Sequence, residues 1–132
     1  MKLKLNFKAD EPTVNGRIYP KEVLKKAFEH RYKTQPVYIC DESSYQPMNI
    51  GIDISHVIGK SPSYEIRDDG TIILDVIPYI NADRFSLLGI KGVELTTCGI
   101  GHVEEDGITI DEDFLLQYMF VDKNSIKGEL DM

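Results

Sequence analysis

A turn followed at once by a helix start occupies residues 15–24, and it constrains the fold more than any other segment. Asn15-Gly16 is a tight-turn signal. Pro20 suits the first position of a helix, where its missing N–H costs nothing. Apolar residues then recur at helical spacing among charged ones: Val23, Leu24, Ala27 and Phe28. The segment therefore predicts a turn and then an amphipathic surface helix.

Short β-strands separated by turns account for most of the remaining chain. Residues 2–8 alternate apolar with polar side chains, as in a strand with one buried face. Asp69-Gly70 favours a hairpin turn, and it precedes a long strand, 71–79, whose central apolar run predicts burial on both faces. Further strands are predicted at 36–40, 50–58, from 64, 93–97, 100–104, 108–110 and 114–121, and a surface loop at 41–49.

A second short helix is predicted over residues 82–88, with Asn81 as its cap and Gly89 at its end. Two helices among many short strands indicate an α+β fold, a small and mainly antiparallel β-barrel. The sequence contains no repeat or linker. We therefore expect a single domain over 1–132, with a short polar tail from about residue 123.

Charge and hydropathy exclude several classes of function. The chain has 22 acidic and 15 basic residues, for a formal net charge of −7, which disfavours nonspecific binding to DNA or to anionic membranes. No apolar run approaches the ~20 residues of a membrane span, and the N-terminus lacks the apolar core of a signal peptide. We therefore expect a soluble, unexported protein with no nucleic-acid or membrane partner.

The two cysteines and three histidines form no recognisable disulfide or metal-binding pattern. They are Cys40, Cys98, His30, His56 and His102. No two of them lie at close ligand spacing, and neither cysteine belongs to a Cys-x-x-Cys pair. The acidic residues between positions 104 and 113 lack the spacing of a calcium loop. The sequence therefore predicts no metal and no cofactor.

Along most of its length the chain resembles the prohead proteases of tailed phages. The resembling segments follow in the family's order: 15–24, 54–60, the hairpin and strand through 79, 85–92, 93–101 and 111–125. The resemblance implies the barrel-plus-helices fold that these enzymes share with herpesvirus assemblins. It also implies a serine nucleophile served by a histidine.

The positions that carry this chemistry in the family hold other residues here. The family pattern places a serine three positions before the Gly-Ile-Gly run at 99–101, and this chain has Thr96 there. An added β-methyl restricts χ1 and crowds the line of attack. The family's usual histidine follows the strand predicted at 36–40, and no histidine occurs between His30 and His56. Because loss of nucleophile or base removes most of the rate enhancement, no catalytic residue is expected.

If the chain is active, its nucleophile is Thr96 or Cys98 and its base is His56. A strand histidine among isoleucines is more often a half-buried, hydrogen-bonded side chain. Cys98 with His102 is a weaker pair, because no third group is evident to orient the imidazole. The motif residues are interpreted as devices of the fold: Asn15, Gly16, Arg17, Tyr19, Pro20, Gly99 and Gly101. Among these, Tyr19 is expected to pack under the helix start and Arg17 to pair with a carboxylate or a backbone carbonyl.

Three functions remain open at this point. The first, favoured by the altered site, is a non-catalytic, protease-derived structural protein of a tailed-phage head. It would bind the major capsid protein or another head protein, with possible self-association, in the host cytoplasm during assembly and then in the virion. The second is an active prohead maturation peptidase that cleaves scaffold and capsid-protein tails. The third is a phage-encoded binding module that acts on a host protein.

Overall fold

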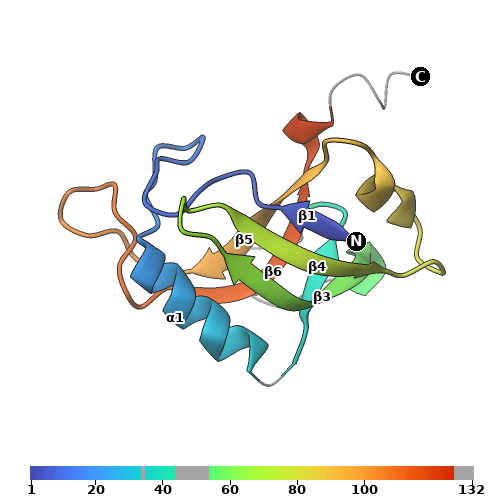
Figure 1. Ribbon diagram of the computed structural model, residues 1–132, viewed down its shortest axis with the longest axis horizontal. Helices are drawn as coiled ribbons and strands as arrows, with labels where there is room; N and C mark the ends of the chain where they lie inside the picture. Colours follow the sequence, from blue (N-terminus) through green and yellow to red (C-terminus); the bar gives the residue numbers. More distant parts are fainter. Residues whose placement is uncertain (34, 44–53, 127–132) are drawn as a thin grey trace.

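The computed structural model describes residues 1–33, 35–43 and 54–126, and these residues form a six-stranded sheet with one α-helix (Figure 1). The strands are β1 (Lys2–Lys4), β2 (Val37–Cys40), β3 (Val57–Ile66), β4 (Ile72–Pro78), β5 (Glu94–Ile100) and β6 (Leu115–Asp122). Their order in the sheet is β1-β4-β3-β2-β6-β5. Neighbouring strands are antiparallel except β2 and β6, which are parallel. The predicted α+β class is confirmed.

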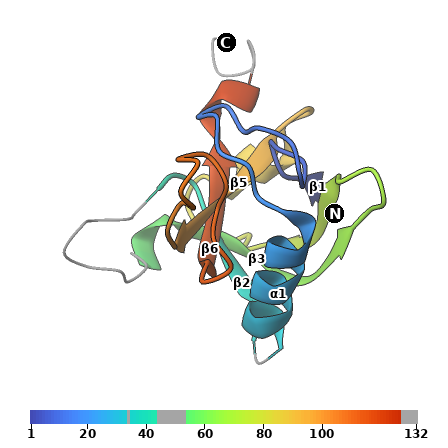
Figure 2. The same ribbon diagram turned by 90° about the vertical axis from the view of Figure 1, so that its left-hand side faces the viewer.

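The sheet curls until its two edges approach each other (Figure 2). Leu5, just after β1, forms a parallel bridge with Leu95 of β5, and the Asn6 N–H donates to the Leu95 carbonyl at 2.8 Å. The result is a half-closed barrel, as the strand pattern predicted. Apolar side chains from all six strands or their ends fill the interior, among them Leu5, Val37, Ile39, Ile58, Leu74, Leu95, Met119 and Val121.

Helix α1 (Lys21–Tyr32) packs on β3 and β6 with the face that the sequence predicted (Figure 2). Leu24, Ala27 and Phe28 are buried. Pro20 is the N-cap residue instead of the first helical residue, and the Lys21 N–H is capped by Asp10 Oδ1 at 2.9 Å. Within the described residues, every helix is too short or too polar to span a lipid bilayer.

The predicted second helix and two predicted strands are wrong in detail. In place of the helix over 82–88 the chain forms a 3-10 helix, η2 (Phe85–Gly89). Arg84 before it has a φ of 60°, which a right-handed α-helix cannot accommodate. The strand predicted at 93–97 is part of β5, which runs on to Ile100. Residues 101–104 form no strand, and they and residues 108–110 contribute only isolated bridges. Strand β4 is buried on one face alone, since Ile77 is 48% exposed.

The strand predicted at 50–58 begins later than expected. Residues 54–56 form a 3-10 helix, η1 (Ile54–His56), and β3 starts at Val57. Ile54 is 84% exposed, so its apolar side chain does not mark a buried strand face. Residues 50–53 lie outside the described part of the chain. The predicted polar tail also contains structure, because η3 (Lys123–Ser125) is followed by the buried Ile126.

Candidate functional site

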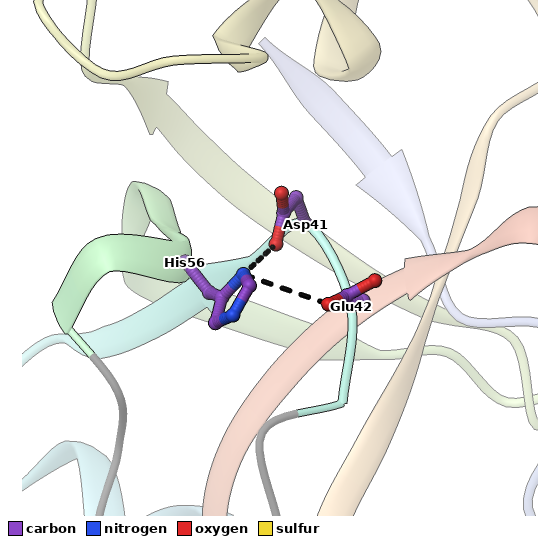
Figure 3. Close-up of side chains that lie close together, drawn as sticks. All are labelled: Asp41, Glu42 and His56. Carbon is purple, nitrogen blue, oxygen red and sulfur yellow. Dashed lines mark hydrogen bonds and ion pairs between the residues drawn. The ribbon is translucent and has the colours of Figure 1, made fainter.

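Three side chains with acid, base and metal-binding chemistry converge where β2 ends and η1 precedes β3 (Figure 3). Nδ1 of His56 lies 2.9 Å from Oδ1 of Asp41 and 3.7 Å from Oε1 of Glu42. The Asp41 backbone N–H also donates to the His56 carbonyl at 2.9 Å. These three residues, which we call the Asp41–Glu42–His56 cluster, are therefore held together by both backbone and side-chain contacts.

Two cations contact the outer oxygens of this cluster. The guanidinium of Arg84 lies 3.6 Å from Oδ2 of Asp41, and the ammonium of Lys123 donates to Oε2 of Glu42 at 3.0 Å. The hydrogen bond from Lys123, followed by its charge, lowers the pKa of the Glu42 carboxyl group. Asp41 is only 5% exposed, and a carboxylate is costly to bury without contacts such as those from Arg84 and His56.

The sequence does not predict this cluster. Its turn composition placed Asp41 and Glu42 in a surface loop, whereas Asp41 is buried, and its apolar pattern placed His56 on a strand, whereas His56 lies in η1. The antiparallel pairing of β2 with β3 brings Asp41 opposite His56. The register of that pairing shifts between Ile39 and Cys40, next to the pair of Ile39 with Gly59. An isolated glycine within a strand often marks such an irregularity, so Gly59 is the one signal in the sequence.

Thr96 lies elsewhere, in a groove of about 290 Å³ beside β5. The groove is lined by Asn6, Phe7, Thr13, Val14, Asn15, Arg17, Tyr19, Thr96, Thr97, Phe120, Asp122 and Asn124. None of these described lining residues is a histidine, a cysteine or a glutamate. Among these lining residues, Asp122 supplies the one carboxylate that shares the groove with the Thr96 hydroxyl, and none supplies an imidazole.

The strand register relates Thr96 to the stretch that holds the catalytic histidine in the resembling proteases. Thr96 pairs with Phe120 on β6, and Phe120 pairs with Cys40 on β2. Two strand spacings are about 10 Å. Phe120, an apolar residue with no proton to exchange, therefore lies between Thr96 and Cys40, the residue at which β2 ends.

Cys98 is half-buried, and its surroundings do not favour a thiolate. Burial raises the pKa of the Cys98 thiol, although a hydrogen bond with Tyr118 on β6 opposes the effect. A raised pKa leaves less of the nucleophilic thiolate at neutral pH. His102 pairs instead with Asp113, at 2.5 Å between Nδ1 and Oδ2, and its side chain is 78% exposed.

The motif residues around position 16 build one wall of the groove. Gly16 adopts a φ of 80° in the turn. The ring of Tyr19 lies between those of Phe7 and Phe114, with centroid distances of 5.0 and 5.3 Å. Burial raises the pKa of its hydroxyl, an effect that Arg17 and Thr97 oppose. Arg17 lines the groove and makes no carboxylate ion pair within the described residues. Tyr19, held between the two rings, thus lines the same groove as Thr96 and Thr97 of β5.

Gly99 and Gly101 have a packing role against Phe114. A Cβ built on Gly99 would lie 2.5 Å from the Leu115 carbonyl oxygen and 2.6 Å from the Phe114 ring. A Cβ on Gly101 would lie 3.1 Å from the Phe114 Cα. Close approach of the following segment therefore explains glycine at both positions.

Comparison with known proteins identifies the fold. No model of a known protein family matches the chain, and no curated protein matches its sequence. Its structure is similar to that of the bacteriophage T4 capsid assembly protease, gp21, with a TM-score of 0.74 and 14% sequence identity. The similarity covers 91% of this chain and 80% of gp21. At that identity it shows the fold alone: this chain has the fold of a phage capsid assembly protease.

Proposed function

We propose that this protein is a non-catalytic structural protein of a tailed-phage head, built on the fold of a capsid assembly protease. The observation that carries the proposal is the groove beside Thr96, whose described lining residues include no imidazole. A hydroxyl group needs an adjacent general base to attack an amide at neutral pH. Phe120, which pairs with Thr96 on the neighbouring strand, has no group that could act as a base.

The other candidate nucleophile and base do not form a replacement pair. The raised pKa of Cys98 disfavours its thiolate. Nδ1 of His56 contacts two carboxylates, and neither of these nor His56 itself lines the groove. Removing one member of a nucleophile–base pair typically costs several orders of magnitude in rate. We therefore expect no physiological peptidase activity.

The phage context rests on the similarity to gp21, which is a capsid assembly protease of bacteriophage T4. A fold alone does not fix a function, but a phage head provides partners for a protease-like domain whether or not it cuts. Our proposal places the protein in the host cytoplasm during assembly and afterwards in the head.

An apolar surface on the outer side of the sheet supplies a contact site for the capsid protein. Tyr38, Ile54, Val57 and Tyr79 line a hollow of about 330 Å³. Ile77 is 48% exposed and lies on the same face as Tyr38, since both align with Lys60 of β3. We call these five apolar residues the outer patch, and we propose that the major capsid protein covers it.

The test is recovery of the intact chain from purified heads of the phage that encodes it. The wild-type chain should be present, uncleaved, at a fixed ratio to the capsid protein. Ile77→Asp should reduce incorporation at least about tenfold, because a charge would be buried at the contact. The control Val14→Asp places the same charge at an apolar residue that is 85% exposed and lies outside the outer patch, and it should be incorporated normally. Absence of the chain from mature heads would contradict the proposal.

One observation favours the second candidate, an active peptidase. The contact between Asp41 and His56 has the form of the carboxylate–imidazole half of a catalytic triad, in which the acid orients the base. If His56 serves Thr96, Thr96→Ala should move the nitrogen resonances of the His56 imidazole in an NMR spectrum. If His56 does not contact Thr96, Thr96→Ala should leave those resonances unchanged.

A further inference from the structure

We infer that Asp41, Glu42 and His56 bind one divalent transition-metal ion, and that Zn²⁺ is the ion whose preferences their donor set matches. The three residues offer two carboxylate oxygens and one imidazole nitrogen. Zn²⁺ accepts both donor types, whereas Mg²⁺ and Ca²⁺ select oxygen ligands. Three protein ligands leave the fourth tetrahedral position for water.

The donor atoms are already close to the spacing that such an ion requires. With metal–ligand bonds of about 2.0–2.2 Å, the ligand atoms of a tetrahedral zinc site stand roughly 3.3 Å apart. The two separations from His56 Nδ1 are 2.9 Å to Asp41 Oδ1 and 3.7 Å to Glu42 Oε1, on either side of that value. All three donor atoms lie within 4.8 Å of one another. Small side-chain rotations are therefore enough to admit an ion.

The outer oxygens of both carboxylates have partners of their own. Arg84 contacts Oδ2 of Asp41 and Lys123 contacts Oε2 of Glu42, whereas Oδ1 and Oε1 face His56. Such outer contacts orient ligating carboxylates in metal sites. The side chains of both cations are about half exposed, at 46% and 50%, so the high dielectric of the nearby solvent weakens their repulsion of an ion bound on the inner side.

The cluster is also reachable from solvent and anchored in the fold. The side chains of His56 and Glu42 are 33% and 40% exposed, while Asp41 is buried. The Asp41 N–H bond to the His56 carbonyl fixes the two backbones that carry the ligands. An ion here would clamp the end of β2 to the start of β3. This inference is independent of the proposed function, since it involves neither Thr96 nor the outer patch.

The test uses the full chain after treatment with a chelator, titrated with ZnCl₂ by isothermal calorimetry near neutral pH. The wild type should bind one Zn²⁺ through the cluster. Glu42→Gln and His56→Gln should each weaken that binding at least about tenfold. The control His102→Gln removes an exposed imidazole outside the cluster, paired with Asp113, and should leave the affinity unchanged. MgCl₂ should bind far more weakly than ZnCl₂.

An NMR measurement on the wild type decides the question even where a variant folds poorly. Zn²⁺ at one equivalent should shift the Nδ1 resonance of His56 and leave that of His102 in place. Equal affinity of Glu42→Gln, His56→Gln and wild-type protein would overturn the inference. A zinc-dependent shift confined to His102, or loss of binding in His102→Gln alone, would overturn it as well.

Discussion

Asp41 and His56 are paired twice, once between Oδ1 and Nδ1 at 2.9 Å and once between the Asp41 N–H and the His56 carbonyl at 2.9 Å. The backbone bond continues the β2–β3 ladder beyond Cys40, and the side-chain contact places a buried carboxylate against an imidazole. The same carboxylate contacts Arg84 through its other oxygen. One buried residue thus links the end of β2, η1 and the residue before η2.

Neutralising the carboxylate of Asp41 should destabilise the fold. Asp41→Asn removes the charge that both His56 and Arg84 contact, and a hydrogen bond to a charged group, such as the one with His56, contributes about 1.5–3 kcal/mol. We expect a loss of about 1–3 kcal/mol in the free energy of unfolding, measured by urea denaturation. Asp83→Asn, at an aspartate that is not buried, is the matched control and should change little. Equal losses in the two variants would contradict the role assigned to Asp41.

The exposed pair of His102 and Asp113 should give stability a pH-dependent component. Hydrogen bonding to Asp113, and then its charge, raises the pKa of His102 above 6.5, and the hydrogen bond with His102 lowers the pKa of Asp113 below 3.8. The histidine contribution is complete below pH 6.5 and is lost as pH rises through the raised pKa. The aspartate contribution is complete above pH 3.8 and is lost as pH falls through the lowered pKa.

The measurement is the midpoint temperature of thermal unfolding of the wild type and of His102→Gln, at pH values from below 3.8 to above 6.5. The difference between the two proteins should be largest between pH 3.8 and 6.5 and should shrink on either side. High salt should reduce it, because both groups are exposed. A difference that grows steadily from neutral to alkaline pH would show that the pair does not act in this way.

Gly99 should not tolerate a side chain. The Cβ of Gly99→Ala would meet the Leu115 carbonyl and the Phe114 ring at 2.5 and 2.6 Å, so β5 and the start of β6 must separate. Overpacking of this kind costs about 1–3 kcal/mol. Gly89→Ala is the control, because a Cβ at that position would have no atom within 4 Å among the described residues beyond its chain neighbours. Urea denaturation of both variants compares them directly, and similar stabilities would refute the packing role of Gly99.

Tyr32 should contribute a buried hydrogen bond to stability, and its phenol should ionise at a higher pH than an ordinary tyrosine. Its hydroxyl donates to Ser61 Oγ at 2.9 Å, and Ser61 is fully buried. Tyr32→Phe should therefore cost about 0.5–1.5 kcal/mol. Burial raises the pKa of Tyr32 to about 12, so the folded state loses stability as pH rises above 10.0, where the unfolded phenol ionises.

The ultraviolet absorbance of tyrosinate provides the check. In the folded wild type one phenol should ionise near pH 12, and Tyr32→Phe should remove that component. Tyr38→Phe, at a tyrosine that is 40% exposed, should leave it in place. Loss of the component in Tyr38→Phe instead would contradict the assignment.

Sequence reasoning predicts the elements whose signal is local. Helix α1 follows from the spacing of Leu24, Ala27 and Phe28, all of which are buried, and the hairpin follows from Gly70, which adopts a φ of 93°. Sequence reasoning fails for η1, because an apolar residue such as Ile54 can be exposed. It fails for the second helix, because arginine is not a residue type that marks the left-handed backbone conformation of Arg84.

The candidate sites depend on register, which the sequence leaves open. The alignment of Thr96 with Phe120 and Cys40 follows from strand order, with β6 between β5 and β2. The meeting of Asp41 and His56 follows from a register shift beside Cys40. A one-residue slip would turn each of these side chains to the other face of the sheet. Long-range pairing therefore decides both sites.

The measurement that tests the proposed function most directly is a cleavage assay. The wild-type chain and a Thr96→Ala, His56→Ala double variant are incubated with their own unfolded chain and with the capsid and scaffold proteins of the phage that the proposal assigns as its source. Intact masses are then followed by mass spectrometry. We predict that the wild type and the double variant leave every protein uncleaved to the same extent. Cleavage at defined sites by the wild type, absent in the double variant, would contradict the proposal that this fold has no catalytic role here.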